Sequence, residues 1–191
     1  MDIFQEKKRL RKELLNRRTN IPENEYQRAS EIIIDNVTQL PEFKRAETIH
    51  CYVSMNNRGE VDTHQLIRRL FSLGKRVVVP ITNFEDGTLI HVILNSFDEL
   101  EKNKWGVLEP EGGEKINPEK LDLVLVPMVG GDEMCNRIGY GKGFYDRFLS
   151  EVSCPKIGLI FEQNIVKRIP VEEFDVTLDK IITEDRVIKH Q

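Results

Sequence analysis

The sequence predicts one α/β domain over residues 1–191, Rossmann-like, in which helices cover both faces of a mainly parallel central sheet and a pair of helices comes first. Residues 48–82 read as strand, helix and strand, an order that places the two strands parallel. The run LDLVLVPMV at 121–129 is typical of a strand buried on both faces of such a sheet. The chain is long enough to bury one core, and we see no linker or internal repeat in it.

Apolar residues at helical spacing predict four helices, over residues 2–18, 21–40, 61–76 and 143–152. The third is the clearest, because Asp62 is placed to cap its start and Gly74 to end it. Pro41 lies just beyond the second helix, where a proline stops helical continuation. The first two helices form the amino-terminal helical pair of the expected fold.

Runs rich in β-branched and aromatic residues predict the strands, over residues 47–55, 76–82, 88–95, 121–129, 155–161 and 180–185. Between the third and fourth strands, residues 105–120 contain several glycines and prolines and therefore predict a loop. Strands and helices thus follow one another in the order expected of a single α/β domain.

Composition and charge argue against several classes of protein. The net charge of -4 lacks the basic excess of a general nucleic-acid or membrane binder, so we expect small-molecule substrates, no nucleic acid and no membrane. Cys51, Cys135 and Cys154 are widely spaced and form no CxxC pair, which favours reduced thiols over a disulfide framework or a zinc cluster. The first residues are charged where a signal peptide is apolar, and no apolar run approaches the roughly 20 residues that span a bilayer. These features predict a cytoplasmic protein.

The segment NRIGYGKGFYDRF at 136–148 follows the most apolar predicted strand. Three glycines alternate in it, namely Gly139, Gly141 and Gly143. In open α/β sheets ligands bind beyond the carboxyl ends of the strands, where this loop lies. Glycines let the backbone approach a ligand closely, successive N–H groups can bind an anion, and the helix that follows adds its positive end. With Arg137 and Lys142 as full charges, the loop predicts a phosphate-binding site.

Two familiar phosphate-binding patterns do not match this loop. A Walker sequence needs Ser or Thr where Gly143 stands and Gly where Asn136 stands. The dinucleotide-binding pattern needs a glycine where Phe144 stands and a shorter distance from the strand. The alternative interpretation is a long turn in which the glycines serve only the backbone conformation and Lys142 is solvated.

Two aspartates are candidate magnesium ligands, since Mg²⁺ usually takes one or two carboxylates together with phosphate oxygens. Asp146 lies just inside the helix after the loop, and Asp179 comes just before the last predicted strand, from which it could reach the same sheet edge. For Asp146 the alternative is an acidic residue placed favourably in a first helical turn.

A basic pair on the first helix is a second candidate for phosphate binding. Lys7 and Arg11 are four residues apart and therefore share one face of the helix. Docked at the sheet edge, this pair would complete a set of cations around a triphosphate. The alternative is a solvated basic face, which charge runs on helices usually form.

The stretch LVLVPMVGGDEMCNRIGYGKGFYDRFL at 123–149 resembles the signature of the 5-formyltetrahydrofolate cyclo-ligase family, whose members are also called 5,10-methenyltetrahydrofolate synthetases. In that family a strand ending in Val-Pro is followed by an Asp and then by Arg-(Leu/Ile)-Gly-(Tyr/Arg)-Gly-x-Gly-Tyr-Tyr-Asp. The positions that match in register are Pro127, Asp132, Arg137, Gly139, Gly141, Gly143, Tyr145 and Asp146. Further matches along the chain are Lys7, Leu10, Arg11, Ser54, Met55, Glu60, Trp105 and Asp179.

Two departures from the family pattern stand out. Phe144 replaces the first Tyr of the usual Tyr-Tyr-Asp and loses one hydroxyl. Gly130 and Gly131 stand where Ala-Phe is common, which predicts a more open wall at that point. Neither departure removes a charge that the chemistry of the family needs.

The resemblance implies a ring closure that depends on ATP and Mg²⁺. The formyl oxygen of 5-formyltetrahydrofolate is phosphorylated by ATP, the neighbouring nitrogen attacks the formyl carbon, and phosphate leaves, giving 5,10-methenyltetrahydrofolate and ADP. Phosphoryl transfer depends chiefly on positioning and on neutralising oxygen charge, so this chemistry needs no protein nucleophile.

The resemblance also implies a role for each candidate site residue. The catalytic cations are Lys7, Arg137 and Lys142. The ATP-binding residues are Lys7, Arg11, Arg137, Ile138, Gly139, Tyr140, Gly141, Lys142, Gly143, Phe144, Tyr145 and Asp146. The magnesium ligands are Asp146 and Asp179. The folate-binding residues are Met55, Glu60, Trp105 and Tyr145, with Glu60 as the polar anchor of the pterin; for the Met and the Trp, packing in the core is the alternative.

Two other functions compete with this interpretation. A sugar-phosphate isomerase would use one phosphate site and a carboxylate base, without ATP or Mg²⁺. A non-catalytic sensor of a phosphorylated ligand would normally carry a DNA-binding or signalling segment, for which we expect no room here. The paired cations on the first helix and the two candidate carboxylates favour a nucleotide with Mg²⁺ over both. We expect the protein to be a monomer or a weak homodimer.

Overall fold

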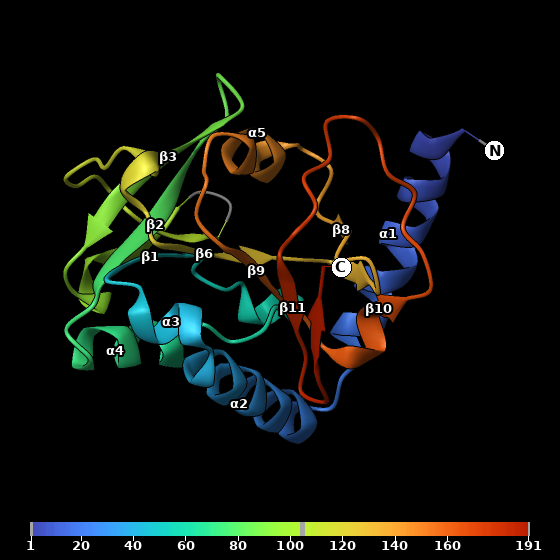
Figure 1. The fold of residues 1–191 in the computed structure, drawn as a ribbon, viewed down its shortest axis with the longest axis horizontal. Helices are drawn as coiled ribbons and strands as arrows, with labels where there is room; N and C mark the ends of the chain where they lie inside the picture. Colours follow the sequence, from blue (N-terminus) through green and yellow to red (C-terminus); the bar gives the residue numbers. More distant parts are fainter. Residues whose placement is uncertain (1, 104–105, 191) are drawn as a thin grey trace.

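The computed structural model describes residues 2–103 and 106–190 and has a seven-stranded sheet at its centre (Figure 1). The order of the strands across the sheet is β12-β11-β9-β6-β1-β2-β3. Their bounds are β1 Thr48–Cys51, β2 Arg76–Asn83, β3 Thr88–Leu94, β6 Leu123–Pro127, β9 Lys156–Leu159, β11 Lys180–Ile182 and β12 Val187–Lys189. The five inner strands run parallel, and β3 and β12 close the two edges antiparallel. The predicted mainly parallel sheet is confirmed.

Helices cover both faces of this sheet, as predicted. Their bounds are α1 Ile3–Thr19, α2 Glu23–Gln39, α3 Pro41–Arg45, α4 His64–Ser72 and α5 Phe144–Ser150. Figure 1 shows α2, α3 and α4 on one face and α5 on the other. The residues of β6 alternate accordingly: Leu123 and Leu125 pack in the core beneath α2 and α4, whereas Val124 and Val126 pack beneath α5. The central strand is therefore buried on both faces.

A small sheet connects α1 to the end of the central sheet. It has the order β10-β7-β8, with bounds β7 Gly130–Asp132, β8 Arg137–Ile138 and β10 Ile165–Val166. Leu14 of α1 is fully buried against Val129, Ile138 and Ile169. These contacts hold α1 next to the glycine-rich loop, beyond the carboxyl ends of the parallel strands (Figure 1).

Gly130 and Gly131 of β7 fill a tightly packed place in the structure. A Cβ on Gly130 would lie 2.3 Å from Cδ1 of Leu14, and one on Gly131 would lie 2.8 Å from Cδ1 of Ile181. The space beside these glycines is thus taken by neighbouring side chains. The expectation of a more open wall at this point is wrong.

The element boundaries agree with the sequence in some places and differ in others. Helix α4 begins one residue later than a cap by Asp62 predicts: its N-cap is Thr63, and Oδ1 of Asp62 accepts a hydrogen bond from the backbone N–H of His64 (2.9 Å). Gly74 follows the end of the helix with a φ of +69°, as predicted. Pro41 begins the short helix α3. The predicted loop at 105–120 includes β5 Leu108–Pro110, which pairs with β4 Leu100–Lys102.

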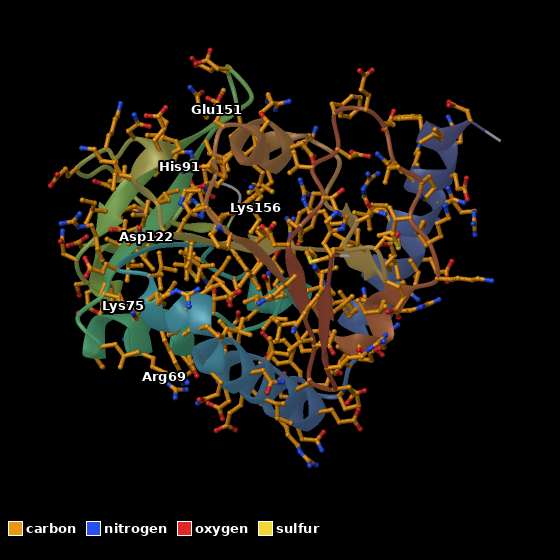
Figure 2. The ribbon with its side chains drawn as sticks, in the orientation of Figure 1. Arg69, Lys75, His91, Asp122, Glu151 and Lys156 are labelled. Carbon is orange, nitrogen blue, oxygen red and sulfur yellow. The ribbon has the colours of Figure 1, made fainter. Side chains whose placement is uncertain are left out.

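The amino ends of the parallel strands lie on the side of the sheet opposite the glycine-rich loop. Figure 2 labels Asp122 and Lys156, which lie where β6 and β9 begin. The carboxylate of Asp122 accepts hydrogen bonds from the backbone N–H groups of Glu47 (3.0 Å) and Thr48 (2.8 Å), at the start of β1. Structural turns therefore lie at the amino ends of these strands.

Among the described helices, none combines the length and the apolarity needed to cross a bilayer.

Candidate active site

A cleft of about 630 Å³ lies where the carboxyl ends of β1, β2 and β6 face α1 and the glycine-rich loop. Fourteen of the predicted site residues line it, namely Lys7, Arg11, Met55, Glu60, Arg137, Ile138, Gly139, Tyr140, Gly141, Lys142, Gly143, Phe144, Tyr145 and Asp146. Trp105, the predicted pterin-binding aromatic residue, lies outside the described residues. The cleft thus brings the residues predicted to bind the nucleotide together with Met55, Glu60 and Tyr145, three of the four predicted to bind the folate.

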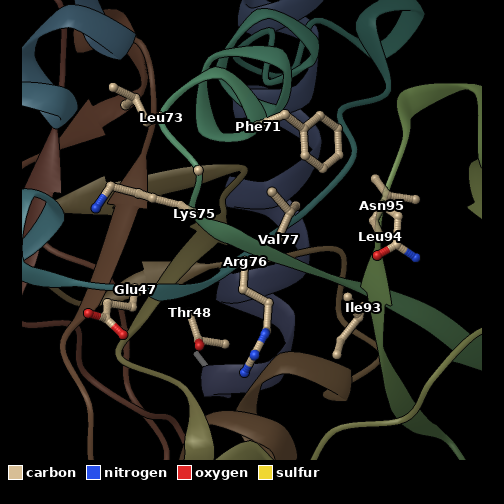
Figure 3. Close-up of a pocket in the computed structure, with 11 residues that line it drawn as sticks. Glu47, Thr48, Phe71, Leu73, Lys75, Arg76, Val77, Ile93, Leu94 and Asn95 are labelled. Atoms are coloured by element: carbon tan, nitrogen blue, oxygen red, sulfur yellow. The ribbon is translucent and has the colours of Figure 1, made fainter.

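A second hollow, of about 790 Å³, lies at the other edge of the sheet (Figure 3). Its lining comes from the end of α4, the starts of β1 and β2 and the end of β3. Lys75 is one of its cations, but its Nζ already donates to the backbone carbonyl of Ala46 (2.5 Å). The glycine-rich loop lies at the opposite edge, so this hollow is separate from the predicted site.

One face of α1 carries three cations into the interior. Lys7, Arg11, Leu14 and Arg18 follow at spacings of four, three and four residues and therefore share that face. Nζ of Lys7 forms an ion pair with Glu172 (2.8 Å) and a second one with Asp175. The solvated basic face that the sequence left open as an alternative does not describe Lys7 and Arg11, because Lys7 is buried and Arg11 is half-buried with its Nε bonded to the backbone of Gly139.

The glycine-rich loop is held against α1 by Arg11. Nε of Arg11 donates to the carbonyl oxygen of Gly139 (2.6 Å), and burial lowers the pKa of the guanidinium. Gly141 has a φ of +86°, and a Cβ there would lie 2.9–3.1 Å from three guanidinium atoms of Arg11. Only glycine combines that backbone conformation with so close an approach of the arginine.

Arg137 and Asp146 form a largely buried ion pair inside the cleft. The Oδ1 atom of Asp146 that accepts from Arg137 also accepts from the backbone N–H of Val176 (3.2 Å). Nε of Arg137 is buried without a hydrogen-bond partner among the described residues. A buried donor without an acceptor is costly. Arg137 also lines the cleft, so its guanidinium charge favours an anion bound there.

Asp146 alone of the two predicted magnesium ligands lies in the cleft. The Oδ2 atom of Asp146 makes no hydrogen bond to the described residues, which leaves one carboxylate oxygen suited to a magnesium ion that also binds phosphate. Glu172 and Asp175 line the same cleft but neutralise Lys7. Within residues 2–103 and 106–190, no three His, Cys, Asp or Glu side chains gather as a complete metal site.

Asp179 lies at the opposite edge of the sheet, so the prediction that it reaches Asp146 is wrong. Its Oδ2 accepts from the backbone N–H of Lys156 (2.7 Å), at the amino ends of β9 and β11. The strand order explains the error: Asp179 precedes its strand, whereas the glycine-rich loop follows β6, and the two strands run in the same direction. Asp179 therefore does not line the cleft and instead holds the start of β9 beside its own strand.

The other end of the cleft is apolar with one buried carboxylate. Tyr52, Val53 and Met55 after β1 line it together with Tyr145, whose buried hydroxyl has no partner in the part of the chain that the structure describes. Burial raises the pKa of Tyr145, so the phenol is protonated. Glu60 faces this end and is only 4% exposed. This part of the cleft suits a flat ring with a polar edge.

Lys142 lies at the open side of the cleft, and its side chain is exposed. Its backbone carbonyl accepts from the guanidinium of Arg147 (3.0 Å), which fixes the loop and leaves the amine in solvent. The ring of Phe144 meets Phe84 edge-on, with centroids 5.8 Å apart. The departure from Tyr at this position thus has an apolar contact in the structure.

Three residues that the sequence did not single out belong to this site. Arg18 is 1% exposed and hydrogen-bonds Tyr140, and its signal was its position seven residues after Arg11 on the same helical face. Glu172 and Asp175, the partners of Lys7, lie in an irregular segment without periodicity. No sequence signal placed that segment beside α1.

Comparison with known proteins gives a consistent result. The chain matches the 5-formyltetrahydrofolate cyclo-ligase family over residues 3–184. It is 33% identical to a probable 5-formyltetrahydrofolate cyclo-ligase of Caenorhabditis elegans, covering 88% of this chain and 87% of that protein. It is 31% identical to the 5-formyltetrahydrofolate cyclo-ligase of Escherichia coli K12, covering 90% and 96%. Among solved structures it is similar to the 5,10-methenyltetrahydrofolate synthetase of Aquifex aeolicus, with a TM-score of 0.85, 34% identity and coverage of 96% and 92%.

Proposed function

Because the chain belongs to the 5-formyltetrahydrofolate cyclo-ligase family, we propose that it converts 5-formyltetrahydrofolate to 5,10-methenyltetrahydrofolate and consumes ATP with Mg²⁺. The observation that carries the proposal is a single cleft with clustered cations at one end and a buried carboxylate among apolar side chains at the other. A nucleoside triphosphate needs the first end, and a pterin needs the second. The single domain proposed over residues 1–191 holds both.

The cationic end, which we call the phosphate end, consists of Lys7, Arg11, Arg137 and Lys142 with the glycine-rich loop. Phosphoryl transfer requires alignment and neutralisation of oxygen charge rather than a protein nucleophile. Arg137 offers a guanidinium charge that lines the cleft, and Lys7 offers an amine that carboxylates now hold inside it. We assign Lys7, Arg137 and Lys142 to the transferring phosphoryl group and Arg11 to the loop and the nucleotide.

Magnesium would bind at Asp146, whose Oδ2 faces no competing donor in the described residues. The ion would neutralise the phosphate oxygens that the arginine and lysine side chains do not reach. Arg137 fixes the orientation of this carboxylate through its ion pair.

The apolar end, which we call the Glu60 end, would hold the pterin. The pterin ring has two opposite apolar faces and an edge of N–H donors, and we assign Glu60 as the acceptor for that edge. Met55 and Tyr145 would contact the ring, and the Tyr145 hydroxyl would gain a polar partner in the substrate. We assign Trp105 to the same pocket on the basis of the family pattern.

The reaction we propose has two steps. The formyl oxygen attacks the γ-phosphorus, the bond from phosphorus to the bridging oxygen breaks, and ADP leaves. N10 then attacks the activated formyl carbon, its proton passes to solvent, and the bond from carbon to the phosphorylated oxygen breaks to release phosphate. The protein aligns the two substrates and excludes water from the phosphorylated formyl group on N5, which would otherwise hydrolyse.

We propose further that the enzyme acts in the cytoplasm, as a monomer or a weak homodimer, on small molecules rather than nucleic acid or membranes. The three cysteines are free in the structure, and two of them are buried, which suits a reducing compartment. Sedimentation at increasing protein concentration tests the oligomeric state.

Absorbance of the purified protein with 5-formyltetrahydrofolate, with and without Mg-ATP, tests the reaction. The product has a conjugated amidinium that the substrate lacks, so we expect a new near-ultraviolet band only in the presence of both ATP and Mg²⁺. No band from a protein that binds ATP in a separate titration would reject the folate assignment and retain the nucleotide site.

A further inference from the structure

A buried row of three side chains joins α1 to the Glu60 end of the cleft. The NH2 atom of Arg18 donates to the Tyr140 hydroxyl (2.6 Å), and that hydroxyl lies 2.7 Å from Oε1 of Glu60. Arg18 is 1% exposed and Glu60 is 4% exposed. A buried charge normally requires a partner of opposite sign, and Arg18 forms no direct ion pair with any residue described. The hydroxyl of Tyr140 therefore connects the two charges.

The direction of each proton in this row follows from the chemistry of the groups. A guanidinium only donates, so the Tyr140 oxygen accepts from Arg18 and its own proton points to Glu60. The other carboxylate oxygen of Glu60, Oε2, accepts from the backbone N–H of Met55 (2.7 Å). Both oxygens of Glu60 thus accept, which is the pattern of an ionised carboxylate.

The remaining donors of Arg18 fix its position. Its Nε donates to the carbonyl of Arg58 (2.9 Å) and its NH1 to the carbonyl of Met128 (2.8 Å). The guanidinium carbon also lies 5.5 Å from the ring centroid of Tyr140. Arg18 therefore cannot swing toward the cleft without losing two backbone partners, and its charge acts from a fixed place.

Burial and charge oppose each other at Glu60. Burial raises the pKa of this carboxyl, and Arg18 is the foremost of the groups that oppose the rise. Six titratable or charged groups on the surrounding elements interact electrostatically with Glu60. They are Arg18, Arg58, Tyr26, Tyr52, Tyr140 and Tyr145. Only the two arginines carry charge at neutral pH, and Arg58 is exposed while Arg18 is buried. Solvent screens the first far more than the second.

We propose that Arg18 is a positioning residue that, through Tyr140, keeps Glu60 an oriented, ionised acceptor for the N–H edge of a ring bound in the cleft. The ring is the pterin if the proposed function holds, and in that respect the inference rests on it. Arg18 itself does not line the cleft. It acts on the substrate only through its effect on Glu60.

Arg18→Met tests the proposal, with Arg17→Met as the matched control on the exposed side of the same helix. We expect KM for 5-formyltetrahydrofolate to rise in Arg18→Met, most strongly on the acid side of the pH profile where Glu60 takes up a proton, with KM for ATP nearly unchanged. At pH values below the Glu60 pKa, each unit by which that pKa rises lowers the ionised fraction about tenfold. The acid limb of kcat/KM for the folate should move to higher pH, since loss of the Arg18 charge raises the Glu60 pKa further. Equal losses for both substrates with an unmoved acid limb would assign Arg18 a merely structural role.

A measurement without substrate separates this inference from the proposed reaction. The carbonyl stretch of protonated Glu60 is read by infrared spectroscopy as the difference between each protein and its Glu60→Gln counterpart. Titration of this band at higher pH in Arg18→Met than in the unaltered protein supports the relay, even if no methenyl product forms. Titration at the same pH in both proteins overturns it, whatever the reaction.

Two further variants keep the test decisive if Arg18→Met fails to fold. Tyr140→Phe removes only the bridging hydroxyl, and the Glu60 band should again titrate at higher pH. Arg18→Lys keeps the buried charge but loses the fork of donors, so it should raise the Glu60 pKa and the folate KM less than Arg18→Met does. An unmoved Glu60 band in Tyr140→Phe would reject the connection through the hydroxyl.

Discussion

At the phosphate end of the cleft, Lys7 and Arg137 are paired directly with carboxylates, whereas at the Glu60 end Arg18 reaches a carboxylate only through the hydroxyl of Tyr140. The direct pairs involve carboxylates that are partly exposed, such as Glu172, whose side chain is 30% exposed. The indirect connection is almost wholly buried. Oppositely charged side chains are therefore in direct contact and partly solvated at the phosphate end, and separated by a hydroxyl and buried at the Glu60 end.

This difference indicates how each end of the cleft would meet the ligand proposed for it, a triphosphate or a pterin. A triphosphate brings several negative charges, so it can replace Glu172 and Asp175 at Lys7 without leaving the cation unpaired. A pterin edge brings only neutral N–H donors, which cannot compete for a carboxylate already bound to an arginine. The separation by a hydroxyl leaves lone pairs of Glu60 open to the cleft. We infer exchangeable pairs at the phosphate end and a preorganised acceptor at the Glu60 end.

Loss of Lys7 should give the largest effect. Lys7→Ala removes a buried cation from the phosphate end, and removal of one such preorganised donor typically lowers kcat by about 10²–10³. Lys8→Ala, on the exposed neighbour, is the matched control. Steady-state kinetics at saturating ATP measure the difference. A turnover of Lys7→Ala equal to that of the control would remove Lys7 from the chemistry and leave it as a partner of the acidic segment.

Asp146→Asn should have the next largest effect. We expect turnover at saturating ATP to fall by between about tenfold and a hundredfold, as when groups that orient a metal site are removed, while the fold stays intact. The amide keeps a weak hydrogen bond to Arg137 but loses the charge that would bind Mg²⁺. Titration of activity with Mg²⁺ should show a raised requirement in the variant. Full activity at low Mg²⁺ would exclude Asp146 as a ligand.

Gly141→Ala should weaken nucleotide binding about tenfold. The new methyl group meets Arg11 at 2.9–3.1 Å, and a side chain at a φ of +86° costs about 1–2 kcal/mol of backbone strain. Gly112→Ala is the control, because nothing lies within 4 Å of a Cβ there. Calorimetric titration with ATP and with 5-formyltetrahydrofolate compares the two ends. Equal weakening of ATP binding and folate binding would mean that the two ends of the cleft are less independent than the geometry indicates.

Lys142→Ala should have the smallest effect. The side chain is exposed, so solvent screens its charge on the transferring phosphoryl group. We therefore expect kcat to fall and KM for ATP to rise only a few-fold each, with KM for the folate unchanged. The rise should shrink as salt is added, because an exposed cation is screened by ions. An equal rise for both substrates would contradict its assignment to the phosphate end.

The sequence predicted those parts of the site that depend on local pattern. The glycine-rich loop is recognisable because Gly139, Gly141 and Gly143 lie within five residues, and Lys7 and Arg11 because helical spacing puts them on one face. The error at Asp179 was avoidable, since a residue before a parallel strand and a loop after one belong to opposite edges. Predicted strand and helix positions were adequate for that deduction.

Other parts of the site depend on contacts that no local pattern encodes. Arg18 shares the helical face of Lys7 and Arg11 in sequence, but only the docking of α1 buries it beside Tyr140. The strands β7, β8 and β10 contain two or three residues each, too few for a periodic signal. Glu172 and Asp175 lie in an irregular segment whose place follows from the whole chain.

The pairing of Lys7 with Glu172 and Asp175 joins residues 165 and 168 positions apart. During translation α1 leaves the ribosome long before these partners are made, so its face of Lys7, Arg11, Leu14 and Arg18 stays uncovered until nearly the whole chain has emerged. Contacts of such sequence separation form late and slowly. A stalled nascent chain would thus present a basic helix to chaperones or proteases, and catalytic competence would arise only after synthesis of the last strands.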